Sequence, residues 1–266
     1  MHGIWRTAAE MGGGWLSGMM LGLSGAGGTA VAGPVFLEVV RTARMHERLA
    51  SAALAVTLTV LVAAVDAVRR RQIPWPALYR LGGPALAGLA IGHWIHRQVM
   101  TPVLSALIMA GFFLVNGIWA AFLRSWWIAW YTRHPRLCRI PAEGAGLVLG
   151  FLGGFGGVGT SFLTVPALWI SGIPEAGGMG VALLLIAGLA LFNAVYYGLH
   201  RAIDWHGVLA YGIGGLLGGL WIRRFQSVWL PRRRWLDVVW AVIMMTAAVV
   251  LVITQDPRLY RGPSVL

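Results

Sequence analysis

The sequence carries little charge, one cysteine and no lysine. Charged residues make up 11% of the 266 residues, whereas a soluble domain carries about 25%. The single cysteine, Cys138, excludes an internal disulfide, a metal site built from cysteines alone and a relay between cysteines. With 58% hydrophobic residues, the chain is predicted to be a polytopic membrane protein with little room for a soluble domain.

The basic residues have a membrane explanation. All 21 are arginine, and they are expected in loops beside the headgroups of anionic lipids. A nucleic-acid partner would need a basic soluble module, and none is visible. Residues 1–10 lack the pattern of a cleaved signal peptide. The lipid bilayer is therefore the expected surrounding.

Eight hydrophobic segments indicate an all-α membrane fold. Most have close to the ~20 residues that a helix needs to cross a bilayer. They cover residues 12–40, 49–68, 77–95, 101–123, 143–170, 178–199, 207–222 and 236–254. The third contains Gly82, Gly83, Gly88 and Gly92, which we expect to serve close helix packing.

Two glycine-rich stretches match one another in a fixed register. The pairs separated by 132 positions are Gly14 and Gly146, Gly18 and Gly150, Gly22 and Gly154, Gly25 and Gly157, Gly27 and Gly159, and Pro34 and Pro166. Further matches follow at an offset of 130, including Ile203 on Ile73 and Gly218 on Gly88. The chain is therefore predicted to hold two homologous repeats of four segments.

Each stretch has two physical parts. Glycines spaced by four, such as Gly14, Gly18 and Gly22, line one helix face and allow another backbone to approach. The denser cluster that follows disfavours a helix, so the first segment of each repeat should be broken there. Freed backbone groups must then face protein or a wet cavity. A resuming helix would direct its N–H groups and positive dipole end toward the break, as in an anion site.

Paired breaks in two halves point to a transporter's substrate site. The predicted substrate-binding residues at the breaks are Gly25, Gly27, Gly28, Thr29, Gly157, Gly159, Thr160 and Ser161. For the hydroxyls, helix capping is the competing role, and both use the same geometry. The predicted units are residues 1–123, a connecting loop 124–141, and residues 142–266. If the broken segments cross fully, there are eight spans and parallel halves; if they are re-entrant, the halves are inverted.

These glycine clusters resemble the sulfite exporter family named for TauE and SafE, which includes the YfcA-type permeases. The likeness covers roughly residues 12–254 and includes the turn at Arg201-Ala-Ile203-Asp204-Trp205. The resemblance implies a bacterial inner-membrane permease, not an enzyme, that moves sulfite, organosulfonates or other small sulfur-containing or organic anions. It implies no cofactor.

A few polar residues lie inside the hydrophobic segments. Asn193 is a candidate substrate ligand, and an equally good candidate for a hydrogen bond between helices. Asp66 could carry a coupling ion, H+ or Na+, although an ion pair with Arg69 or Arg70 is the favoured role. His93 is expected to be a packed neutral histidine. Glu38 and Glu143 are expected at the interface, and no His, Asp and Glu cluster has metal-ligand spacing.

One enzymatic alternative rests on a short motif. Gly22-Leu23-Ser24-Gly25 matches the Gly-x-Ser-Gly of rhomboid-type intramembrane serine proteases. Such chemistry needs a histidine base beside the serine, and the candidates are His93, His200 and His206. The repeat argues against it, because Ser24 falls opposite Gly156.

The sequence thus predicts a permease for a small anion that works by alternating access between the breaks. Neither glycine cluster contains an arginine. Positive potential would come from two helix N-termini, each equivalent to about half a charge. This favours a small mono- or dianion over nucleotides, polyanions and bare cations.

Overall fold

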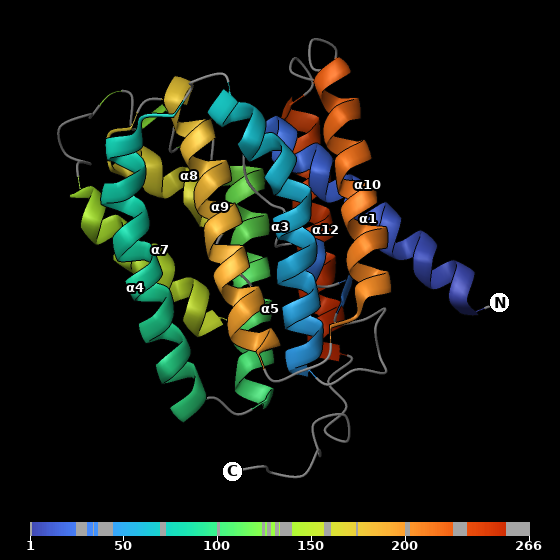
Figure 1. Ribbon diagram of the computed structural model, residues 1–266. Helices are drawn as coiled ribbons and strands as arrows, with labels where there is room; N and C mark the ends of the chain where they lie inside the picture. The colour runs from blue at the N-terminus through green and yellow to red at the C-terminus, as the bar shows by residue number, and fades with distance from the viewer. Residues whose placement is uncertain are drawn as a thin grey trace.

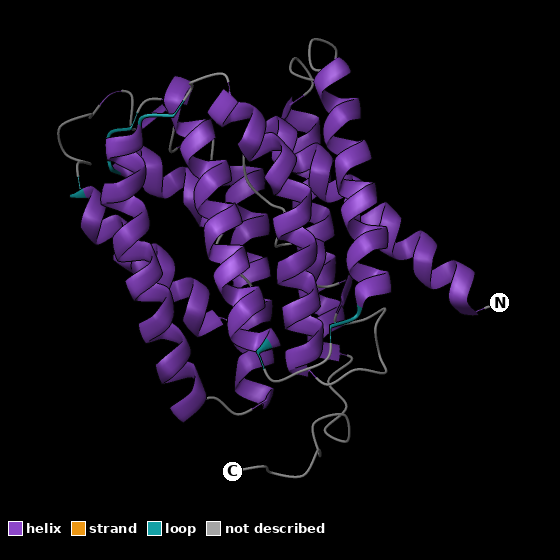
Figure 2. Ribbon diagram, in the orientation of Figure 1, coloured by secondary structure: helices purple, strands orange, loops and turns teal. Residues whose placement is uncertain are grey.

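The computed structural model is helical throughout its described part. It describes residues 2–24, 31–33, 35–36, 45–69, 73–99, 102–123, 126, 129–130, 133, 140–156, 161–173, 175–199, 203–225 and 233–253. Within these ranges there are helices and short turns but no strand (Figure 2). The all-α class is confirmed.

The helices follow the predicted hydrophobic segments closely (Figure 1). In the first half they are α1 (His2–Ser24), α3 (Met45–Arg69), α4 (Trp75–Val99) and α5 (Pro102–Ile118), which continues into the π-helix η1 (Trp119–Leu123). In the second half they are α7 (Ala142–Gly156), α8 (Ser161–Ile170), α9 (Glu175–Gly198), α10 (Trp205–Arg224) and α12 (Arg233–Ile253). The main difference is that α1 begins ten residues before the expected start at residue 12.

Glycine faces join two pairs of helices by direct backbone contact. In α1, a methyl group on Gly14 would overlap the carbonyl oxygen of Tyr211, and one on Gly18 would overlap that of Gly215 in α10. The same arrangement joins α7 to α4, where a methyl group on Gly150 would overlap the carbonyl oxygen of Ala85. The expected packing role of these glycines is confirmed.

The third predicted segment shows where this expectation was wrong. Gly88 and Gly92 of α4 face the α7 backbone, and Gly82 lies near the Leu185 side chain. Gly83, however, has nothing within 4 Å of where its methyl group would be. Neighbouring residues differ by about 100° around a helix, so Gly82 and Gly83 cannot both face one partner.

Helix directions divide the molecule into two sets. Helix α10 runs parallel to α1, and also to α3, because Ser51 contacts Asp204 at one end while Asp66 meets Arg223 at the other. Helices α4, α7 and α9 are likewise mutually parallel, as the facing pair His93 and Asn193 illustrates for α4 and α9.

The two sets run in opposite directions. Ala50, near the start of α3, lies beside Gly198 at the end of α9, while Ala67 near the end of α3 shares a buried cluster with Val181 near the start of α9. These two helices lie side by side in the middle of the bundle (Figure 1). Three pairs of helices at matched positions in the proposed repeat therefore run in opposite directions: α1 and α7, α3 and α9, and α4 and α10.

Both broken segments turn back on themselves. At the second, the N–H of Ile140 before α7 donates to the carbonyl oxygen of Ile170 at the end of α8, at 3.0 Å. At the first, Val35 lies against Gly13, so the chain beyond the break has returned to the level of the middle of α1. These contacts favour the re-entrant alternative over full crossing.

The outer surface is apolar. Helix α10, for example, exposes Leu209, Ile213, Leu217 and Leu220 along one face. Two helices among the described residues are long and apolar enough to cross a membrane, at Glu47–Arg69 and Gly178–Gly198. Exposed apolar stripes of this kind are what a lipid-facing surface requires.

Candidate functional site

Most of the predicted substrate-binding residues lie outside the described residues. These are Gly25, Gly27, Gly28, Thr29, Gly157, Gly159 and Thr160. The flanking helices are described: α1 ends at Ser24, α7 ends at Gly156, and α8 begins at Ser161. Helices α1 and α7 therefore both end where glycine becomes dense in the sequence, as the low helix propensity of glycine predicts.

Helix α8 starts with buried hydroxyl groups. Ser161 is 1% exposed and Thr164 is 0% exposed. Residues three apart share a helix face, so both belong to the same side of the first turn. The first N–H groups of a helix have no partner within it. The beginning of α8 thus combines a positive dipole end with two buried hydroxyl-bearing residues.

A polar cluster lies beside the second break. The Nε2 atom of His93 is 2.6 Å from Oδ1 of Asn193, and Nδ1 of His93 is 3.3 Å from the Tyr197 hydroxyl. The imidazole also stacks on Tyr196, with ring centroids 4.2 Å apart. A methyl group on Gly154 would lie 2.8 Å from the backbone nitrogen of His93. This places the cluster at the level of the last turn of α7.

The same cluster reaches the first broken segment. Tyr197 belongs to a buried apolar group that includes Val31, just beyond the first break, and Phe113 of α5. The neighbouring Phe112 packs its ring against Gly156, at the end of α7. Helices α5 and α9 therefore connect the surroundings of both breaks.

These contacts bear on the roles predicted for Asn193 and His93. Asn193 does join helices, because it hydrogen bonds to His93 across the α9–α4 contact. His93 is packed, at 1% exposed, as expected. Neither contact tests whether Asn193 also binds substrate, which stays a prediction.

Asp66 has a partner that the sequence did not indicate. Its Oδ2 atom lies 3.0 Å from a guanidinium nitrogen of Arg223 in α10. The next residue toward the N-terminus, Ile222, packs against Gly22 near the end of α1. The ion pair therefore lies close to the level at which α1 ends.

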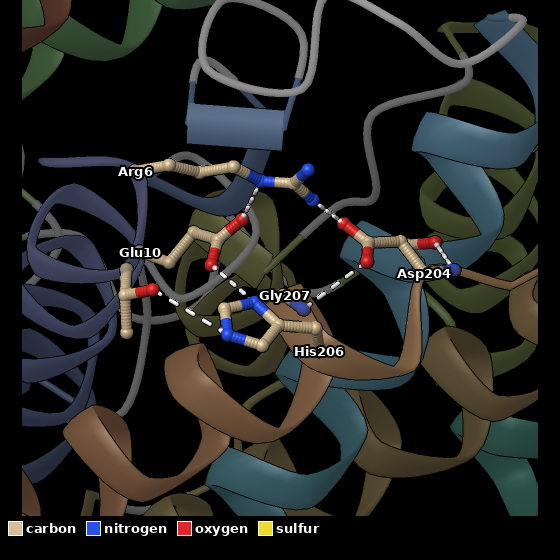
Figure 3. Close-up of polar contacts among 7 residues, drawn as sticks. Arg6, Glu10, Asp204, His206 and Gly207 are labelled. Atoms are coloured by element: carbon tan, nitrogen blue, oxygen red, sulfur yellow. Dashed lines mark hydrogen bonds and ion pairs between the residues drawn. The ribbon is translucent and has the colours of Figure 1, made fainter. Parts of the chain in front are cut away.

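A second polar network, which sequence reasoning missed, ties α1 to α10 (Figure 3). Arg6 donates from Nε to Oε1 of Glu10 at 2.8 Å and also pairs with Asp204. Asp204 caps α10 by accepting from the Gly207 N–H, and its own N–H donates to the Ser51 hydroxyl of α3 at 3.0 Å. His206 approaches Glu10 from the first turn of α10. The spacing of Arg6 and Glu10 by four was the available signal, and it predicts only a local pair.

Two of the three candidate bases for a serine protease, His93 and His206, have other neighbours in the structure. Both ring nitrogens of His93 face other side chains. His206 lies beside Glu10, which is fourteen residues, or roughly 21 Å, from Ser24 along α1. His200 and the Ser24 side chain lie outside the described residues. The described residues also include no group of three or more His, Cys, Asp or Glu that could hold a metal ion.

Comparisons with known proteins agree with this architecture. Two proteins from Xylella fastidiosa, strains 9a5c and Temecula1 / ATCC 700964, are each 27% identical over 217 residues, covering 79% of this chain and 80% of theirs. Both are described as a probable membrane transporter protein. No solved structure matches the chain.

The fold and these relatives define a membrane transporter. The sequence model of one family, described as Sulfite exporter TauE/SafE, matches residues 11–252. The chain belongs to this family.

Proposed function

We propose that the protein is a permease of the bacterial cytoplasmic membrane that moves a small anion by alternating access. Sulfite, an organosulfonate or a related sulfur-containing or organic anion is the substrate class. The two repeats are residues 1–123 and 142–266, joined by residues 124–141, and the substrate binds between their glycine breaks. No covalent chemistry is required.

The observation that carries this proposal is the reciprocal pairing of glycine-faced helices. The first helix of each half packs on the third long helix of the other, α1 on α10 and α7 on α4. Because matched helices run in opposite directions, the halves fit an inverted repeat, the architecture that supports alternating access in many transporters.

Two features favour an anion over a cation. The first turn of α8, which contains the buried residues Ser161 and Thr164, presents the N–H groups of a helix N-terminus to acceptor oxygens. Asp66, the residue that would serve a cation-coupled route, already faces Arg223 at 3.0 Å. Its negative charge is therefore balanced within the protein.

Flux into proteoliposomes tests the substrate class. Purified protein should move sulfite or methanesulfonate, and sodium alone should not bind. If succinate is carried in preference to both sulfur-containing anions, the substrate belongs to the organic part of the proposed class. If sodium alone binds and Asp66→Asn removes that binding, the anion proposal is wrong.

A pair of bulky substitutions tests the breaks themselves. Gly27→Leu and Gly159→Leu should each abolish flux while the protein remains in the membrane, because a large side chain blocks approach of the ligand to the backbone. Gly188→Leu is the matched control, since Gly188 is exposed on α9 with nothing within 4 Å of its added methyl group. Normal flux in both break variants would remove the proposed site.

A further inference from the structure

Glu10 is a buried acid with an unsatisfied oxygen. Its side chain is 0% exposed, although it lies only eight residues from the start of α1. Oε1 accepts from Arg6, but Oε2 has no hydrogen-bond partner. Nδ1 of His206 lies 3.5 Å from Oε2 of Glu10. A buried carboxylate oxygen without a donor is unfavourable, and a proton bound at Oε2 turns this atom from an unpaired acceptor into a donor.

The charges around Glu10 also favour one additional proton. Among the described residues, the charged and titratable groups in contact are Arg6 on α1, with Asp204 and His206 on α10 (Figure 3). Helix α3 contributes the neutral Ser51. One guanidinium is shared by two carboxylates. Arg6, Glu10, Asp204 and a neutral His206 together carry a net charge of minus one, and one bound proton neutralises these four described groups.

His206 gives that proton a route. Its side chain is 63% exposed, in contrast to the buried Glu10. A proton from water can add to Nε2, which lies 3.4 Å from the Thr7 hydroxyl. Nδ1 then releases its own proton to Oε2 of Glu10, and the ring returns to its neutral form.

The network is connected to the moving parts of the proposed permease. Glu10 lies on the helix that ends at the first glycine break, and that helix packs backbone to backbone on α10. Arg6 and Asp204 join the two helices, and Asp204 also holds Ser51 of α3. Protonation of Glu10 removes one of the two carboxylates that compete for Arg6. It thereby changes how tightly α1 is held to α10 and α3.

We propose that Glu10 and His206 form a proton-binding site that couples proton movement to anion movement. The inference rests on the proposed permease function and assigns its coupling ion as H+. In the proposed repeat, the counterpart of the α1–α10 contact is the α7–α4 contact, and its matched positions hold Ala142, Pro74 and Pro76. The proposed proton-binding groups are therefore specific to the α1–α10 contact.

Infrared spectroscopy of the purified chain tests proton binding without requiring transport. As the pH falls from about 8 to 5, wild type should gain a protonated-carboxyl band that is missing in Glu10→Gln. Glu143→Gln is the matched control, because Glu143 is 53% exposed and pairs only loosely with Arg80, at 3.5 Å. His206→Gln should shift the pH at which the band appears. Identical spectra for wild type and Glu10→Gln across this range would overturn the proposal.

Proteoliposomes test the coupling. The probe is labelled methanesulfonate, which stays ionised across this range. For one proton per anion, a gradient of about one pH unit should maintain about a tenfold concentration ratio of the anion. Glu10→Gln should reduce that ratio to about one while exchange at equal pH continues, and Glu143→Gln should behave as wild type.

The possible failures are distinguishable. If wild type exchanges no methanesulfonate, transport of sulfonates is wrong, and the infrared titration alone decides the proton site. If exchange occurs but the gradient has no effect, coupling is wrong while the permease function stands. If Glu10→Gln loses exchange as well, the His206→Gln variant decides. If His206→Gln keeps exchange but loses the response to the pH gradient, the site is supported. If His206→Gln keeps both exchange and the gradient response, the proposal is overturned.

Discussion

Replacing Gly88 by alanine would place a methyl group against the backbone of the neighbouring helix. The added carbon would overlap the carbonyl oxygen of Leu147 and lie 2.8 Å from the nitrogen of Phe151. Ordinary contacts begin at 3.4 Å, so α4 and α7 would have to separate by roughly 1 Å at this point. The neighbour is backbone, which cannot rotate away as a side chain can.

The expected size of the effect follows from overpacking. Extra methyl groups in a well-packed contact destabilise by about 1–3 kcal/mol. Alanine also favours the helix by up to about 1 kcal/mol over glycine, which would partly hide the effect. Gly188→Ala removes this complication, because Gly188 has nothing within 4 Å and gains the same propensity without a clash.

The assay compares the two variants with one another. Reversible unfolding of purified protein should show Gly88→Ala to be less stable than Gly188→Ala by about 1–3 kcal/mol. This corresponds to a change of about 5- to 150-fold in the unfolding equilibrium. Equal stability of the two variants would refute the close contact of α4 with α7, and with it the reciprocal packing on which the permease proposal depends.

Three further substitutions have defined outcomes. Ser24→Ala should retain most transport, because glycine stands at the matched position Gly156; labelling of Ser24 by an activity-based serine probe, lost in the variant, would instead support the protease alternative. Asn193→Ala should lower stability in thermal unfolding by about 1–3 kcal/mol, since it removes the partner of buried His93. Asp66→Asn should destabilise by about 1 kcal/mol through loss of its partly buried pair with Arg223, and an unchanged melting temperature would show that this pair contributes nothing.

Hydropathy and glycine spacing predicted much of the architecture. The long helices begin and end within a few residues of most predicted segments, because apolar length is a local property of the chain. The glycine faces of α1 and α7 were also predictable, since a spacing of four identifies one side of a helix. Their partners were not, because spacing does not say which helix lies opposite. Gly83 was misassigned for the same reason.

The polar contacts were largely hidden in the sequence. Arg6 and Asp204 are 198 positions apart, and His93 and Asn193 are 100 positions apart, so no periodic pattern links either pair. The early start of α1 was missed because residues 2–11 include charged side chains that a hydropathy argument places outside a span. Only the folded chain shows that Glu10 is buried against α10.

The most direct test of the central claim is a structure determined with methanesulfonate or sulfite bound. The account predicts anion density between the two glycine breaks, with oxygens about 3 Å from backbone N–H groups at the start of α8, beside Ser161. Anion density that saturates at another place, with none at either break, would contradict it.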